Sequence, residues 1–227
     1  MKRLIFTTCL LAALSGYTQS DSTNVKVNGG EKTLEVQLSP FGDDPINING
    51  IRARWFSTDK KAFRLNAFLV YYADTQVTQQ GSGNGNDDLK DRATTFTFSV
   101  RPGFENHILV TERLSPYFGM EFDFTFQTTS FRSEQQTGGV QVNYTKRVNE
   151  NGFVRIGANA VAGMDFYVAK KLYIGTEFGF GFSYTGLLAV KVKSDVAGFE
   201  EPDPLKRGSS FDLGPNVVAE IRLGYAF

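Results

Sequence analysis

The sequence predicts an all-β protein, an eight-stranded antiparallel up-and-down transmembrane β-barrel that is preceded by a cleavable signal peptide. Three observations support this prediction. The chain begins with an export signal, eight later segments alternate between apolar and polar residues, and the connections between these segments alternate between short and long. Strict alternation has the period of a strand with two different faces.

The start of the chain has the order of a secretory signal. Two basic residues precede an apolar run over residues 4–14, and small and polar residues follow it. The run is too short for a spanning helix, which needs about 20 apolar residues. We therefore expect a signal peptide at 1–20, a short periplasmic segment at 21–31 and the barrel at 32–227.

Composition excludes several classes of protein. Cys9 is the only cysteine and lies within the apolar run, so the exported chain is expected to contain no disulfide and no thiolate metal site. The formal net charge is zero, and no basic block is present to attract nucleic acid. The 21 phenylalanines and 23 glycines suit the alternating strands of a membrane barrel.

The first four predicted strands occupy residues 33–39, 47–56, 63–72 and 94–104. In each of them, apolar residues share one parity and polar residues tend to share the other. The apolar parities are, in order, Leu34, Val36 and Leu38; Ile51, Ala53 and Trp55; Phe63, Leu65, Ala67, Leu69 and Tyr71; and Phe96, Phe98 and Val100.

The last four predicted strands occupy residues 118–127, 153–168, 172–184 and 217–227. The first of these has the clearest alternation, because every second residue is a large apolar one. The apolar parities are Phe118, Met120, Phe122, Phe124 and Phe126; Val154, Ile156, Ala158, Ala160, Ala162, Met164 and Phe166; Ile174, Phe178, Phe180 and Phe182; and Val217, Ala219, Ile221, Leu223, Tyr225 and Phe227. A lipid-facing strand explains why the chain ends on an aromatic residue of the apolar face.

The connections support a membrane barrel. Residues 57–61 and 169–171 are expected to form tight turns, whereas 74–92, 128–152 and 186–212 are expected to form long loops. Outer-membrane barrels have short periplasmic turns and longer outer loops. Because the strand count is even, both termini are expected on the periplasmic side.

The polar parity carries a balanced set of charges that we expect inside the barrel. An arginine that faces lipid near the middle of the bilayer costs roughly 2–4 kcal/mol, so the polar parity must face the lumen. An eight-stranded barrel is filled by its own side chains, and arginines can fill it by forming bidentate pairs with carboxylates. The predicted lumenal charge network comprises Glu35, Arg52, Arg54, Arg64, Arg101, Glu121, Asp123, Arg155, Asp165, Glu177, Glu220 and Arg222.

Aromatic residues gather beside the predicted short turns. Trp55, Phe63, Tyr117 and Tyr173 are expected at the periplasmic boundary of the membrane. Barrels carry girdles of aromatic residues at both boundaries.

The strand rhythm, the segment 111–122 and the terminal sequence 222–227 resemble the outer-membrane β-barrel domain family, small eight-stranded barrels similar to the outer-membrane protein A and X barrels. The resemblance implies that the barrel assembly machinery reads Tyr225 and Phe227 as an assembly signal, and that periplasmic chaperones are partners before insertion. It also implies the outer membrane of a Gram-negative bacterium as the location. Members share no catalytic motif.

No catalytic residue, cofactor or metal site is predicted. His107 is the only histidine and is expected to be a solvated residue of a periplasmic turn. Glu121 and Asp123 are expected to pair with lumenal arginines rather than to act as catalytic acids.

The favoured function is a non-enzymatic barrel with a structural role or one that presents its long loops to partners. The expected partners are outer-membrane lipid and an extracellular or surface-polysaccharide partner, and no nucleic acid. Two alternatives remain open. One is a small passive channel or carrier for small or apolar solutes, and the other is a soluble lipocalin-like ligand-binding barrel, which needs its apolar face inward.

Overall fold

The computed structural model describes residues 25–38, 48–81, 88–108, 111–137, 141–215 and 220–227. The predicted signal peptide at 1–20 lies outside these ranges. No helix within them is long and apolar enough to cross a membrane. The described strands are β1 (Lys32–Leu38), β2 (Ile48–Thr58), β3 (Lys61–Gln79), β4 (Leu89–His107), β5 (Leu114–Thr137), β6 (Gln141–Val148), β7 (Phe153–Ala169), β8 (Leu172–Leu187), β9 (Lys191–Ser194), β10 (Ser209–Pro215) and β11 (Glu220–Ala226).

Eight of the described strands close an antiparallel ring, in the order β1, β2, β3, β4, β5, β7, β8 and β11. The ring closes between the first and last strands, where Leu34 lies opposite Tyr225 and Val36 opposite Leu223. The predicted fold class, an all-β eight-stranded antiparallel barrel, is therefore confirmed.

The remaining three strands extend strands of this ring. The long strand β5 pairs with β7 through residues 114–127 and with β6 through residues 130–137, so β6 and β7 form one interrupted strand. In the same way β9 continues β8, because β8 pairs with β7 and β9 pairs with β6. Strand β10 pairs with residues 180–186 of β8. Strand β11, which follows β10 in the chain, pairs with residues 172–177 of β8.

The prediction of long loops at 74–92 and 128–152 was wrong in large part, whereas 186–212 includes a long connection between β9 and β10. Strand β3 runs to Gln79, β4 begins at Leu89 and β5 runs to Thr137, so hydrogen-bonded ladders occupy much of these segments. The physical reason is that a strand outside the bilayer has water on both faces. It therefore loses the alternation of apolar and polar residues by which a lipid-facing strand is identified.

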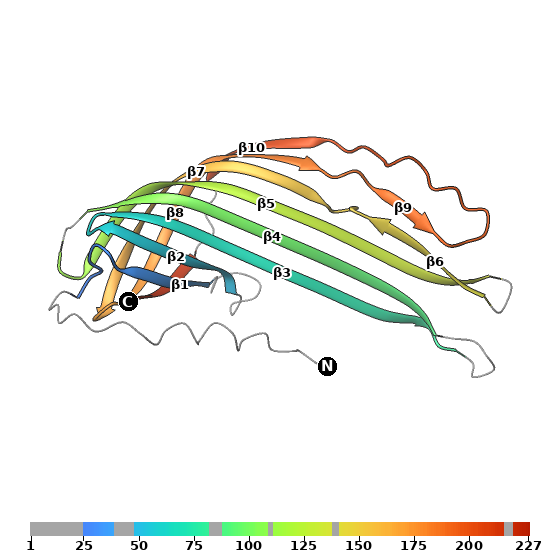
Figure 1. Ribbon diagram of the computed structural model, residues 1–227, viewed down its shortest axis with the longest axis horizontal. Coiled ribbons are helices and arrows are strands. Elements are labelled where there is room, and N and C mark those ends of the chain that lie inside the picture. The colour runs from blue at the N-terminus through green and yellow to red at the C-terminus, as the bar shows by residue number, and fades with distance from the viewer. Residues whose placement is uncertain (1–24, 39–47, 82–87, 109–110, 138–140, 216–219) are drawn as a thin grey trace.

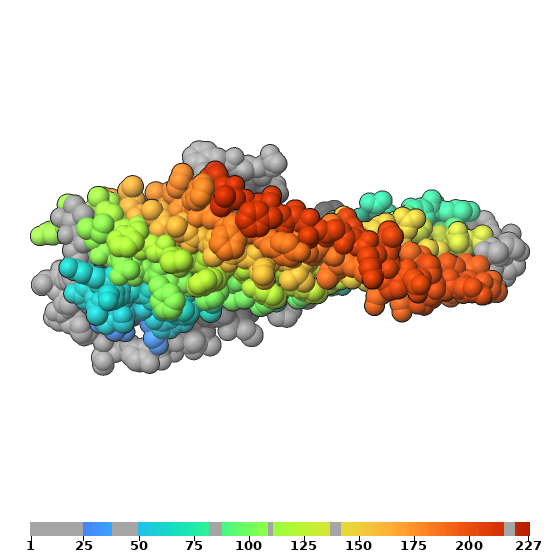
Figure 2. Space-filling model, turned by 90° about the horizontal axis from the view of Figure 1, so that it is seen from above, coloured from blue at the N-terminus to red at the C-terminus, as the bar shows by residue number. Residues whose placement is uncertain are grey.

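The extended strands give the molecule an elongated shape. Strands β3 and β4 have 19 residues and β5 has 24, whereas about 9–11 residues suffice for a strand to cross a bilayer. In Figure 1 these strands leave the barrel together and continue beside β6 and β9. Figure 2 shows the result from above, a broad barrel that narrows into a long arm. We call this arm the outer extension.

The two faces of the barrel wall differ as the alternation predicts. Along β5, Phe118, Met120 and Phe122 are exposed on the outer surface, whereas Glu121 and Asp123 are buried in the lumen. A polar lumen excludes the soluble lipocalin-like alternative, which needs an apolar one.

The end of the barrel opposite the outer extension is closed by short connections and by the N-terminal segment. The backbone amides of Lys32 and Phe227 each donate to the carbonyl of the other, at 3.0 and 2.9 Å. Beside them, the amide of Lys171 in the turn between β7 and β8 donates to the carbonyl of Val25. We call this end of the barrel the base.

Candidate functional site

All eight strands of the ring contribute charged side chains to one buried cluster near the base. Alternation turns every second residue inward, so residues far apart in sequence meet in the lumen. The side chains of this cluster are at most 11% exposed. We call it the central network, and its members are Glu35, Arg52, Arg54, Arg64, Glu105, Glu121, Asp165, Glu177 and Arg222.

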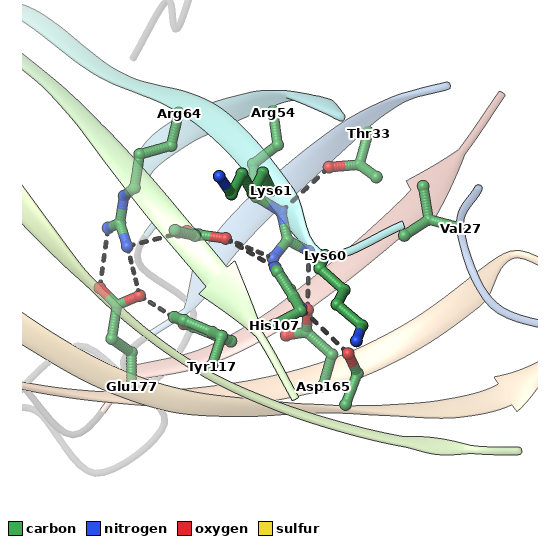
Figure 3. A network of polar contacts seen from close by, with 12 residues as sticks. Val27, Thr33, Arg54, Lys60, Lys61, Arg64, His107, Tyr117, Asp165 and Glu177 are labelled. Carbon is green, nitrogen blue, oxygen red and sulfur yellow. Dashed lines mark hydrogen bonds and ion pairs between the residues drawn. The ribbon is translucent and has the colours of Figure 1, made fainter. Parts of the chain in front are cut away.

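Arg54 of β2 is the hub of the part nearest the base (Figure 3). Its Nε lies 2.6 Å from Glu35, while its two terminal nitrogens lie 3.0 Å from Glu105 and 2.8 Å from Asp165. The Nε also donates to the hydroxyl of Thr33 at 3.2 Å. A single guanidinium therefore contacts carboxylates from β1, β4 and β7.

Arg64 of β3 is the hub of the next layer. It forms a bidentate pair with Glu177 at 2.7 and 2.8 Å, and it also contacts Glu105 at 2.9 Å and Glu121 at 2.6 Å. Arg52 approaches Glu177 with both of its terminal nitrogens, each at 3.0 Å. Bidentate arginine–carboxylate pairs fix both distance and orientation, so this layer joins opposite walls of the barrel rigidly.

Arg222 and two tyrosines complete the network. Arg222 of β11 contacts Glu35 at 3.0 Å and Asp165 at 3.1 Å. The hydroxyl of Tyr173 donates to Glu35 at 2.9 Å, and that of Tyr117 donates to Glu177. Figure 3 shows Arg64 and Tyr117 both directed at the carboxylate of Glu177.

Glycines on the inner face provide the space that these side chains occupy. Gly175 lies opposite both Asp165 and Arg222 in the strand register, and a Cβ there would lie 2.6 Å from each of them. Gly224 lies opposite Tyr173, and a Cβ there would overlap its ring. The close approach of the strands' side chains therefore requires glycine at these positions.

Two of the four predicted interface aromatics were placed wrongly. Trp55 and Phe63 lie on the outer surface and contact each other, with ring centroids 5.6 Å apart. Tyr117 and Tyr173, in contrast, are 2% and 0% exposed and point into the lumen. Their parity is that of Glu121 and Glu177, and their hydroxyls satisfy buried carboxylates, so they belong to the polar face.

The prediction that His107 is a solvated turn residue was also wrong. The imidazole is 4% exposed, and its nitrogens lie 2.9 Å from the Ser115 hydroxyl and 3.1 Å from Glu105. Strand β4 continues to His107 and turns its side chain inward. Serine, histidine and glutamate recur in hydrolases, but here Ser115 is itself buried and Glu105 is held by Arg54 and Arg64.

Sequence reasoning missed Glu105, which contacts both hub arginines. The predicted strand ended at Phe104, one residue too early, although Glu105 continues the inward parity of Arg101. Of the other predicted charges, the side chain of Glu220 lies outside the described part of the chain.

Burial of the lumenal charges decreases toward the outer extension. Asp123 contacts Arg155 at 3.0 Å and Arg101 at 3.6 Å. These two arginines are 32% and 34% exposed, whereas the arginines of the central network are at most 1% exposed. The lumen is therefore tightly filled near the base and accessible to water beyond Asp123.

Below the central network, the N-terminal segment covers the base. Lys171 contacts Glu31 at 2.8 Å and donates to the carbonyl of Lys26 at 2.6 Å. Lys26 in turn donates to the carbonyl of Leu114 at 2.7 Å, and burial lowers the pKa of its ammonium group. Val27 packs with Tyr167 in a small apolar cluster beneath the charges.

The arrangement is suited to holding the barrel wall together rather than to chemistry. Four of its five carboxylates are shared between arginines, and Glu121 pairs with Arg64, which leaves them poorly available as proton donors or metal ligands. Within the described ranges, no group of three or more histidine, cysteine, aspartate or glutamate side chains is placed to hold a metal ion.

Comparisons with known proteins identify a family for the chain. The model of the OmpA-OmpF-like porin family matches residues 36–203. No curated protein matches the chain. Among solved structures, CarO2 of Acinetobacter baumannii is similar at 10% identity and a TM-score of 0.38, covering 87% of this chain and 98% of that one. CarO of the same organism has 12% identity and a TM-score of 0.36, covering 88% and 97%.

Proposed function

Since this outer-membrane β-barrel belongs to the OmpA-OmpF-like porin family, we propose that it is a non-enzymatic protein whose lumen is closed by the central network. Its role is structural: the closed barrel anchors the outer extension in the membrane and presents it outside the cell.

The observation that carries this proposal is that one set of ion pairs spans the lumen and includes all eight strands of the ring. A continuous water channel requires these pairs to separate. Opening the lumen exchanges several short arginine–carboxylate contacts for contacts with water and separates wall strands that these contacts join. The contacts therefore favour the closed form.

The orientation follows from the asymmetry of the two ends. Short turns and both ends of the barrel segment lie at the base, and outer-membrane barrels turn their short connections toward the periplasm. We place the base in the periplasm and the outer extension outside the cell.

Assembly depends on the terminal strand in this proposal. Tyr225 lies on the outer face of β11, and Phe227 is the residue that follows this strand. Both side chains are exposed, so a partner can reach them before the ring closes. We propose that they are the signal for the barrel assembly machinery, to which periplasmic chaperones deliver the chain.

A passive channel is the second candidate function. It is favoured by the water-accessible lumen beyond Asp123, where Thr97 and Gln127 line the wall and bond to each other at 3.0 Å. In the closed form this space is a vestibule that ends at the central network.

Three cysteine substitutions separate these possibilities. Thr97→Cys lies above the central network, Thr33→Cys lies below it in the lumen, and Lys60→Cys lies in the turn between β2 and β3. Each variant is expressed, and a membrane-impermeant thiol reagent is then added to the intact cells. We expect labelling of Thr97→Cys alone, with all three variants labelled after denaturation.

Two results contradict the proposal in different ways. Labelling of Thr33→Cys as fast as Thr97→Cys shows that water passes the central network, which favours the channel. Labelling of Lys60→Cys in place of Thr97→Cys shows that the barrel has the opposite orientation.

A further inference from the structure

The strand register aligns four cations across the outer extension. Arg92 of β4 lies directly opposite Arg132 of β5, Arg132 opposite Lys146 of β6, and Lys146 opposite Lys193 of β9. Directly opposed residues point to the same side of a sheet, so the four side chains share one face. We call these four residues the basic row.

The basic row destabilises the sheet of the outer extension, and ion pairs within the protein offset this effect only in part. Like charges directly opposite each other destabilise a sheet. Within the described part of the chain, neither Arg92 nor Lys146 forms an ion pair, whereas Arg132 contacts Glu134 at 3.4 Å and Lys193 contacts Glu201 at 4.0 Å. The remaining positive charge is available to an anionic partner from outside the chain.

The basic row lies on the face that is turned away from the lumen. Arg132 has the same parity as Phe124 and Phe126 on β5, and the pairing of β4 with β5 has a constant register between these positions. The row therefore belongs to the same outer surface as the lipid-facing residues. It faces whatever surrounds the barrel rather than solutes in the vestibule.

The height of the basic row places it just outside the hydrocarbon. Arg92 precedes Phe96, the first outward-facing phenylalanine of β4, by four residues, and Arg132 lies six residues beyond Phe126 on β5. At about 3.4 Å per residue and a tilt of about 40°, the row lies roughly 10–15 Å above the last large apolar side chains. This is the level of the lipid head groups.

We propose that the basic row binds the phosphate groups of the phosphorylated glycolipid that forms the outer leaflet. Four cations spaced about 4.8 Å apart extend over about 14 Å, which suits a head group that carries more than one phosphate. Arginine forks match phosphate oxygens in pairs, and the guanidinium of Arg132 is held 4.0 Å from the ring centre of Tyr144. The inference rests on the proposed orientation.

The test compares two double variants of the purified, folded full chain in detergent. Arg132→Gln with Lys146→Gln removes the middle of the basic row. Arg147→Gln with Lys206→Gln removes the same charge elsewhere, because Arg147 points to the opposite face of the sheet and Lys206 lies outside the row. The probe is lipid A with two phosphates, and its fully dephosphorylated form is the control.

We expect the wild type and the Arg147, Lys206 variant to bind bisphosphorylated lipid A equally well. The Arg132, Lys146 variant is expected to bind it at least about tenfold more weakly, since loss of one charge-assisted contact costs about 1.4 kcal/mol or more. The wild type is expected to bind dephosphorylated lipid A as weakly as the Arg132, Lys146 variant binds bisphosphorylated lipid A.

Equal binding by all three proteins, or equal weakening in both double variants, overturns the proposal. Tighter binding of a soluble acidic polysaccharide than of lipid A also overturns it and assigns the row to a different partner. Binding in detergent does not depend on orientation. If Lys60→Cys is labelled in intact cells, the orientation has failed and the row does not face the outer leaflet, even where the binding result holds.

Discussion

At the scale of single residues, the interior of this barrel depends on a few arginines that are shared by several carboxylates. Arg54 contacts Glu35, Glu105 and Asp165 at 2.6 to 3.0 Å, and all four side chains are excluded from water. A shared arginine supports more of the network than one pair does, because its removal leaves several buried anions close together.

Replacement of Arg54 by alanine is therefore expected to lower the free energy of unfolding by about 3–5 kcal/mol, the cost of breaking a buried ion pair. The matched variant Arg101→Ala removes an arginine that is 34% exposed and is expected to cost less than about 1 kcal/mol. Urea unfolding of both proteins from lipid vesicles measures the difference. Equal losses in the two variants would show that burial of the network contributes nothing.

The inward tyrosines provide a second test at this scale. Tyr173→Phe removes the hydroxyl that donates to Glu35 at 2.9 Å, and the loss of a hydrogen bond to a charged group is expected to cost about 1.5–3 kcal/mol. Tyr225→Phe on the outer wall is expected to leave the unfolding free energy within about 0.5 kcal/mol, as is usual for surface substitutions. The same vesicle assay checks both. A neutral Tyr173→Phe would contradict a role for this tyrosine in the network.

At the scale of elements, several large inward side chains lie opposite a glycine on the neighbouring strand. Tyr173 on β8 lies opposite Gly224 on β11, and Arg64 on β3 lies opposite Gly103 on β4. This pairing explains how an eight-stranded barrel holds so many long side chains. The sequence shows the inward glycines, but which side chain fills each space depends on the register between strands far apart in the chain.

Gly224→Ala is expected to lower the free energy of unfolding by about 1–3 kcal/mol, since its Cβ would overlap the ring of Tyr173 in a filled interior. Gly214→Ala in β10 is the matched control, because no atom lies within 4 Å of its added Cβ. We expect it to change stability by less than about 0.5 kcal/mol. The register between β8 and β11 would be in doubt if the two alanines had equal effects.

The terminal strand supports a prediction about assembly. Removal of Phe227, or Phe227→Asp, is expected to leave export intact and to reduce the amount of folded barrel in the outer membrane. Phe227→Tyr keeps the aromatic ring and is expected to assemble normally, and Phe199→Asp, in the connection between β9 and β10, serves as a control for an added charge. The shift in gel mobility on heating reports the folded fraction. Undiminished folded protein in the Phe227→Asp variant would contradict the assembly signal.

The sequence predicts the membrane part of these elements well and the outer extension poorly. Alternation along β5 identifies its lipid-facing half because lipid tolerates only apolar side chains. Beyond Phe126 both faces are hydrated, so the strand continues to Thr137 without a pattern. Prediction of the candidate site from the sequence has the same limit, because it depends on a visible alternation of apolar and polar residues. Arg54 could be assigned to the lumen from its parity, whereas Glu105 and His107 were missed because the predicted strand and its pattern ended too early.

At the scale of the whole molecule, a closed base and an open outer half divide the lumen. The N-terminal segment and the apolar cluster around Tyr167 lie beneath the central network, and the water-accessible vestibule lies above it. The long strands then continue beyond the closed ring into the outer extension (Figure 1). In the proposed function, the filled barrel anchors the outer extension in the membrane.

Electrical recording from the pure protein in a planar bilayer tests the closed lumen most directly. With the central network intact, we expect no steady ion current above that of the bare membrane at moderate voltage and neutral pH. Arg52→Ser combined with Glu177→Ser removes a bidentate pair from the centre of the lumen and is expected to introduce a current, provided that the variant still shows heat-modifiable folding. A steady, reproducible conductance from the wild-type protein would contradict a closed barrel and favour the passive channel.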